Sequence, residues 1–132
     1  MTKTFKTTAR ALFATAALLT AASGAQAFGF DICEDVTIKV VNNSGEPIQV
    51  YDINYYDYGQ SLWRSEPTPN RVIAHGASWS DERNLEDVED ASTRVNIKYR
   101  TLGSNGRWKD KHSAKSSKFT CNEGDRVTIT ID

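Results

Sequence analysis

The sequence predicts a small all-β domain, an antiparallel β-sandwich of the immunoglobulin-like kind with one disulfide, and a small closed β-barrel is the alternative. Three observations predict this fold class. Seven or eight short runs of alternating apolar and polar residues recur about every ten residues. No stretch between these runs has the length and period of a crossover helix. Finally, the two cysteines each precede a run, one the first and the other the last.

Length and composition agree with one ordinary globular domain. The chain has 132 residues, of which 39% are hydrophobic and 25% are charged. These values are close to average usage, so a disordered chain, a collagen-like repeat and a long coiled coil are all excluded as descriptions of the whole protein.

Residues 1–27 are expected to be a cleaved secretory signal peptide, which leaves residues 28–132 as a single β-sandwich domain. A basic start is followed by the apolar stretch 11–22, which is too short and too rich in alanine to span a bilayer. The small-x-small sequence at 25–27 is the kind that a signal peptidase accepts. No later run is long enough for a transmembrane segment. We therefore expect a periplasmic or secreted protein, and the alanine-rich signal is typical of a bacterial source.

The expected strands are residues 36–40, 48–55, 71–73, 78–80, 94–100, 107–109, 113–120 and 127–131. The first is ended by the turn formers at 42–45, and glycine, proline, asparagine or aspartate lie between most of the others. The run 94–100 is the clearest, because its odd-numbered residues from Val95 are apolar and are expected to face the core. Its even-numbered residues, Asn96 among them, are expected to face outward.

Two segments do not fit the strand pattern. Residues 56–70 contain one glycine and two prolines and are expected to be a long loop, a place where function is often found. Residues 81–90 are the only helical candidate, because Leu85 and Val88 are three residues apart. This segment is so acidic that one exposed turn or an extended loop is an equal alternative.

Cys33 and Cys121 are the only cysteines, and an even count in a small exported domain predicts a disulfide between them. Each precedes a strand, so the bridge would place the starts of the first and last strands at the same end of the molecule. Adjacent strands in that arrangement run parallel to each other, as the first and last strands of immunoglobulin-like sandwiches do.

Charge is unevenly distributed along the chain. Residues 31–90 carry 13 acidic and four basic side chains, whereas residues 91–126 carry nine basic and three acidic ones. The charges either pair between neighbouring strands or polarise the surface. Without residues 1–27 the chain has 13 basic and 17 acidic residues, and this acidic balance argues against a nucleic-acid partner.

The residues needed for common catalytic sites are scarce, so we expect no enzyme and no cofactor. His75 and His112 stand in no metal-binding or hydrolase motif, and no phosphate-binding glycine loop is present. The acidic residues of 81–90 lack the spacing of a calcium loop, so no metal site is expected.

The segment 51–63 combines four tyrosines and a tryptophan with aspartate and amide side chains. Such residues suit a protein interface, and they also suit a sugar-binding surface. In an uninterrupted strand, Tyr51, Ile53 and Tyr55 would share one face, and about half of the rings would point into the core. The candidate binding residues are Tyr55, Tyr56, Asp57, Tyr58, Trp63, Arg64 and Glu66.

These features predict an exported, non-catalytic binding domain. A protein partner, as for an inhibitor or an immunity-type factor, is the leading expectation. A carbohydrate- or envelope-binding module is the first alternative, and a membrane-active β-sandwich toxin is the second.

Overall fold

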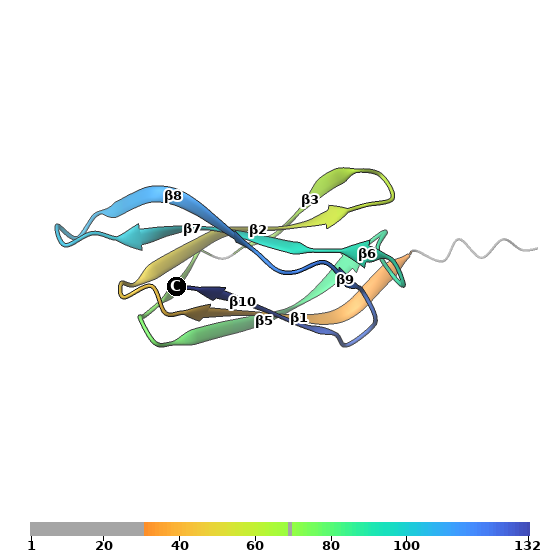
Figure 1. Cartoon of the computed structure of the whole chain (residues 1–132), viewed down its shortest axis with the longest axis horizontal. Coiled ribbons are helices and arrows are strands. Elements are labelled where there is room, and N and C mark those ends of the chain that lie inside the picture. Colours follow the sequence, from red (N-terminus) through yellow and green to blue (C-terminus); the bar gives the residue numbers. More distant parts are fainter. Residues whose placement is uncertain (1–30, 69) are drawn as a thin grey trace, which may run out of the picture.

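The computed structural model describes residues 31–68 and 70–132, so the expected signal peptide lies outside the described residues. Within this part of the chain there are ten strands and no helix (Figure 1). The strands are β1 (Ile32–Asn42), β2 (Ile48–Asp57), β3 (Leu62–Glu66), β4 (Arg71–Ile73), β5 (Ser78–Glu86), β6 (Ser92–Thr93), β7 (Val95–Leu102), β8 (Trp108–Lys115), β9 (Phe119–Thr120) and β10 (Arg126–Ile131). No helix able to cross a membrane is therefore found among the described residues.

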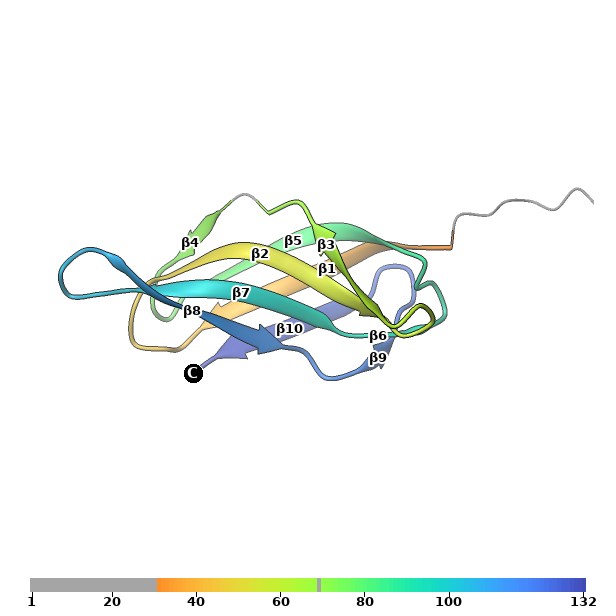
Figure 2. The ribbon, with the colours of Figure 1, turned by 90° about the horizontal axis from the view of Figure 1, so that it is seen from above.

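The strands form two main layers, and the predicted β-sandwich is confirmed. One layer has the order β10-β1-β5, and the other has the order β3-β2-β7-β8 with β4 also paired to β2. In Figure 2, β3 and β4 follow each other along the same edge of β2. The short strands β6 and β9 pair with each other at the end of the molecule where β1 begins (Figure 1).

The first and last strands pair in parallel, as the cysteine positions predicted. β1 and β10 are in register from Thr37 opposite Arg126 to Asn42 opposite Ile131. Cys33 and Cys121 form the disulfide, which joins positions 88 residues apart in the sequence.

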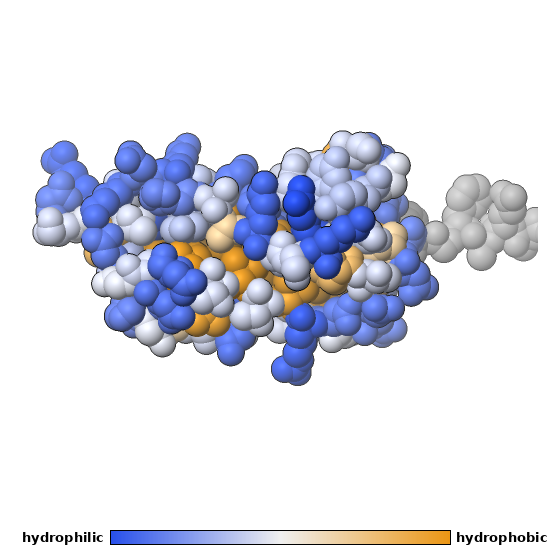
Figure 3. Space-filling view, viewed as in Figure 1, coloured by the Kyte–Doolittle hydropathy of each residue, from blue (hydrophilic) through white to orange (hydrophobic). Residues whose placement is uncertain are grey.

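The core lies between the two layers and is made mainly of aliphatic side chains, which alternate with polar ones along β1, β7 and β10. Its fully buried members include Val36, Ile38, Val40, Ile48, Val50, Ile53, Leu85, Val95 and Ile97. Polar and charged side chains cover the outside, and apolar atoms show along the seam between the layers (Figure 3). Burial of this apolar surface is the main favourable contribution to folding.

A β-bulge in β2 overturns part of the predicted alternation. The register against β7 shifts between Val50 and Asp52, so Tyr51 is an extra residue on β2. Val50 and Ile53 are consequently both buried, although they are three residues apart. Tyr51 does not share the inner face of Ile53 and Tyr55, and its ring instead lies 5.0 Å from the guanidinium of Arg100.

Two further predictions are wrong. The expected loop 56–70 is largely a hairpin, in which β2 extends to Asp57 and β3 begins at Leu62. The expected helical or irregular segment 81–90 is mostly the second half of β5, which pairs with β1 along its length. Tertiary pairing outweighs local preference here, because β1 offers a hydrogen-bonding edge to a chain whose Trp79 and Leu85 can face the core.

Candidate binding site

Strand alternation divides the seven predicted binding residues into two groups. In the β2–β3 hairpin, Tyr56 is opposite Trp63 and Tyr55 is opposite Arg64. Since neighbouring residues on a strand point to opposite faces, these two pairs lie on opposite sides of the sheet. Tyr56, Tyr58 and Trp63 face away from the other layer, whereas Tyr55, Asp57, Arg64 and Glu66 face toward it.

The outward group forms a compact cluster of rings. The ring of Tyr56 lies 4.7 Å from that of Tyr58 and 5.0 Å from that of Trp63, measured between centroids, with edge-to-face geometry in both pairs. Edge-to-face packing is the favoured arrangement of aromatic pairs. Trp63 keeps 40% of its surface exposed, so part of the cluster is open to solvent.

Three cations surround these rings, and the sequence did not single them out. The guanidinium of Arg94 lies 5.7 Å from the Tyr56 centroid and 5.6 Å from that of Trp63. The ammonium groups of Lys115 and Lys118 lie 5.5 Å from Trp63 and 4.2 Å from Tyr58 respectively. We call this surface the aromatic–cation face; it consists of Tyr56, Tyr58, Trp63, Arg94, Lys115 and Lys118.

Few of the cations in the second half of the chain pair with carboxylates. Of the nine basic residues in 91–126, only Lys98 and Lys109 form ion pairs within the described part of the chain. The cations of the aromatic–cation face therefore contact rings and solvent, and no carboxylate of residues 31–68 or 70–132 forms an ion pair with them. A cation over an aromatic ring is attracted by the ring quadrupole, and its charge remains available to an acidic ligand.

A row of polar side chains crosses the same sheet beside the rings. Lys98 donates to Asp52 at 2.6 Å, Asn54 donates to Asp52 at 3.0 Å, and Asn96 donates to Asn54 at 2.6 Å. The hydrogen bond to Asp52 raises the pKa of Lys98, so this lysine is a fixed cation. Asn96 faces outward as predicted but is only 5% exposed, which sequence alternation alone did not indicate.

The inward group holds the hairpin to β5 and the turn after it. The hydroxyl of Tyr55 accepts a hydrogen bond from the backbone N–H of Glu86 and donates to its carbonyl. Burial raises the pKa of Tyr55 to about 12. Arg64 pairs with Asp57 at 3.0 Å and also with Asp87.

The two carboxyl groups on this inner side are perturbed in opposite directions. The backbone N–H of Gln60 and then Arg64 hold the pKa of Asp57 below its usual value, despite its burial. Burial raises the pKa of Glu66, and the charge of Arg83 offsets only part of this rise.

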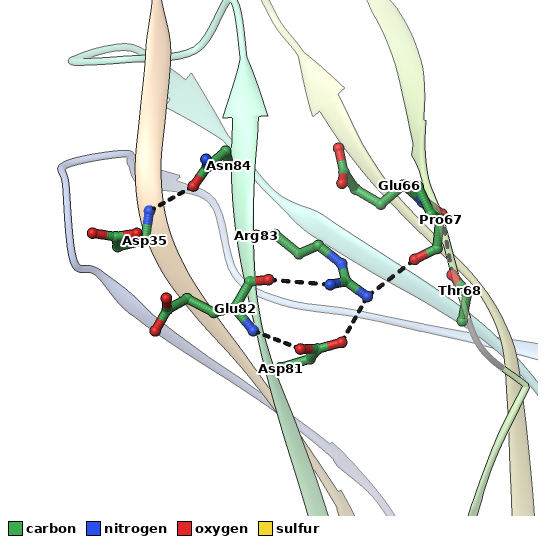
Figure 4. Close-up of a pocket in the computed structure, with 8 residues that line it drawn as sticks. All are labelled: Asp35, Glu66, Pro67, Thr68, Asp81, Glu82, Arg83 and Asn84. Carbon is green, nitrogen blue, oxygen red and sulfur yellow. Dashed lines mark hydrogen bonds and ion pairs between the residues drawn. The ribbon is translucent and has the colours of Figure 1, made fainter.

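Glu66 borders a cavity of about 790 Å³ between β5 and the β3–β4 connection. Figure 4 shows Arg83 of β5 reaching across it, where its guanidinium pairs with Asp81 and donates to the carbonyl of Pro67. Among residues 31–68 and 70–132, no group of three or more His, Cys, Asp or Glu side chains could hold a metal ion. Within β5, the acidic residues alternate between the two faces of the strand and do not converge.

The two histidines lie apart from the aromatic–cation face. His75 accepts a hydrogen bond from the backbone N–H of Gly45, and His112 packs against Tyr99 with 5.4 Å between ring centroids.

Comparison of the chain with protein-family models, with curated proteins and with solved structures found no match.

Proposed function

We propose that this protein is an exported, non-catalytic binding domain whose aromatic–cation face recognises an acidic surface on a protein partner, as an inhibitor or immunity-type factor would. The observation that carries the proposal is the cluster of rings and cations on one face of the β3-β2-β7-β8 sheet, without carboxylate partners for those cations among the described residues. Tyrosine, tryptophan and arginine are the residue types most enriched among interface hot spots.

The composition of the face favours an acidic protein over an apolar one. Only three large hydrophobic side chains among the described residues are markedly exposed, and they do not form one broad apolar patch. Trp63 and the two tyrosines supply rigid contact area with few rotatable bonds, while Arg94, Lys115 and Lys118 supply steering and charge-assisted hydrogen bonds. The disulfide is consistent with an oxidising compartment outside the cytoplasm.

To test the proposal, the immobilised domain is used to retain one protein from an envelope extract, and its binding to that purified partner is then measured. Trp63→Ala is expected to weaken binding by roughly 30-fold or more, the ratio that corresponds to a hot-spot loss of about 2 kcal/mol. Val72→Ala is the matched control, since Val72 is 55% exposed and lies on β4, outside the face.

Charge reversal provides a second readout. Lys115→Glu is expected to slow association and to reduce its dependence on salt, whereas Lys39→Glu on β1 of the opposite layer leaves both unchanged. Binding that is indifferent to Trp63→Ala and Lys115→Glu would contradict the proposal. Retention on immobilised glycan alone would favour the carbohydrate-binding alternative, and dye release from liposomes would favour the membrane-active one.

A further inference from the structure

The polar row Lys98–Asp52–Asn54–Asn96 has only one consistent hydrogen-bond direction. An ionised Asp52 can only accept, so Asn54 must turn its amide N–H₂ toward Asp52 and its oxygen toward Asn96. Asn96 then donates to that oxygen, and its own Oδ1 is left over. Within the described residues, this buried oxygen has no hydrogen-bond partner.

The unpartnered oxygen belongs to a side chain that lines a surface cavity of about 290 Å³. Its walls are Asn54, Trp63, Asn96, Lys98, Ser113 and Lys115. This volume is at the small end of ligand sites and suits a single amino-acid side chain better than a large cofactor. We call it the Asn96 pocket.

The cationic groups of the Asn96 pocket are not equivalent. Lys98 is already bound to Asp52 at 2.6 Å, whereas Lys115 contacts the Trp63 ring and forms no ion pair within residues 31–68 and 70–132. Lys115 is opposite Asn96 in the pairing of β7 with β8, so a free cation and a free acceptor are adjacent. A complementary group must bring an anion for Lys115, a hydrogen-bond donor for Asn96 and apolar atoms for Trp63.

An acidic residue of a polypeptide offers all three. Its carboxylate suits Lys115, its methylene groups suit the ring of Trp63, and a backbone N–H of the same segment suits Asn96 Oδ1. We propose that the Asn96 pocket receives a glutamate or aspartate side chain of the protein partner. This inference rests on the proposed function, since the pocket adjoins the aromatic–cation face and shares Trp63 and Lys115 with it.

Small probes test the pocket without the partner. The disulfide-bonded protein is titrated with the tripeptide acetyl-Gly-Glu-Gly-amide, and the side-chain N–H signals of Asn96 and Trp63 are followed by NMR. Saturable shifts of both signals are expected. Two control peptides are each expected to bind at least tenfold more weakly. One is acetyl-Gly-Gln-Gly-amide, which lacks the charge, and the other is the glutamate peptide N-methylated at glutamate, which lacks the donor.

A pair of variants on one strand separates the pocket from general electrostatics. Lys115→Gln is expected to weaken the glutamate peptide at least tenfold, whereas Lys111→Gln, which removes the same charge from β8 outside the pocket, changes its affinity less than twofold. Both positions are exposed, and preserved backbone NMR signals show that the fold is intact.

The outcomes that overturn the inference are distinct from those that overturn the proposed function. Equal binding of the glutamate and glutamine peptides would show that the pocket does not recognise an acidic side chain. NMR shifts caused by glucuronate and not by the glutamate peptide would show the same. If the peptide causes no NMR shifts but Trp63→Ala still weakens binding of the partner, the inference about the pocket is wrong and the proposed function is unaffected. If the glutamate peptide binds in the pocket but no protein partner is retained, the proposed function is wrong and the assignment of the pocket is unaffected.

Discussion

Tyr55 and Tyr56 are adjacent on β2 but point to opposite faces of the sheet, and their side chains therefore have different roles. Tyr55 is 2% exposed and binds the backbone of Glu86, whereas Tyr56 packs among the outward rings. Substitution of each by phenylalanine removes only the hydroxyl oxygen. The two variants therefore compare a hydroxyl that is buried and hydrogen-bonded with one on the outward face.

Tyr55→Phe is expected to lower the free energy of unfolding by about 1–2 kcal/mol, because the Glu86 backbone loses a buried partner in both directions. Urea denaturation measures this loss. Tyr56→Phe is the control and is expected to change stability by less than about 0.5 kcal/mol, as for an ordinary surface site. Equal stability of the two variants would contradict the structural role of the Tyr55 hydroxyl.

The raised pKa of Tyr55 predicts a loss of stability at alkaline pH. Above pH 10.0 the unfolded chain releases the phenolic proton, while the folded protein retains it up to about pH 12. The unfolded state then binds fewer protons, so the free energy of unfolding falls as pH rises through this window. Urea denaturation across this range should give a shallower decline for Tyr55→Phe than for the unaltered protein, and parallel declines would contradict the assignment.

At the level of elements, the β2–β3 hairpin builds the aromatic–cation face. Its register places Tyr56 opposite Trp63, and its turn is closed by Asp57, which accepts a hydrogen bond from the backbone N–H of Gln60 at 3.0 Å. Ser61 adopts a φ of 56°, in the left-handed region that side chains other than glycine rarely occupy. The hairpin is therefore strained at one position next to the site.

Ser61→Gly is expected to raise the free energy of unfolding by up to about 1 kcal/mol, and Ser61→Val is expected to lower it by about 1–2 kcal/mol. The measurement is the urea midpoint of each variant. Ser65→Gly is the matched control within β3, where glycine is expected to destabilise by about 0.5–1 kcal/mol. A loss of stability in Ser61→Gly as large as that of the control would show that the turn imposes no strain.

On the scale of the whole molecule, one covalent bond joins β1 to the connection that leads from β9 into β10, the last strand of the described domain. Cys33 and Cys121 are both fully buried, and the loop between them spans 88 residues. Closing so long a loop restricts mainly the unfolded chain. The same bridge holds the start of β1 near β6 and β9, at the end that also carries the β2–β3 turn (Figure 1).

The double variant Cys33→Ala/Cys121→Ala is expected to lose up to about 4–5 kcal/mol of stability, the chain-entropy contribution of a loop of this length. Urea denaturation of the variant and of the unaltered protein, with thiol titration showing no free thiol in the latter, checks this. An unchanged urea midpoint would mean that the bridge contributes little to folding.

Much of the architecture could be predicted from local patterns. Alternation predicted the run at Val36 and the run at Val95, and the cysteine positions predicted a bridge between parallel terminal strands, which the structure confirms. The predictions failed at Tyr51, where a bulge inverts the alternation, and over 81–90, where pairing with β1 overrides an acidic composition. They also failed over 56–70, where β3 pairs back onto β2 as a hairpin. The first two failures depend on a partner strand distant in sequence.

In the candidate site too, some features could be predicted from the sequence and others depend on the fold. The amino-acid order alone identified the aromatic segment and the cysteine pair, because ring content and cysteine count are local properties. Packing of the strands determines which rings face solvent and brings Arg94, Lys115 and Lys118 beside them. It also leaves Asn96 Oδ1 without a hydrogen-bond partner among the described residues. The physical reason is that strand register assigns every side chain to a face and a neighbour, and register depends on long-range pairing and on a single bulge residue.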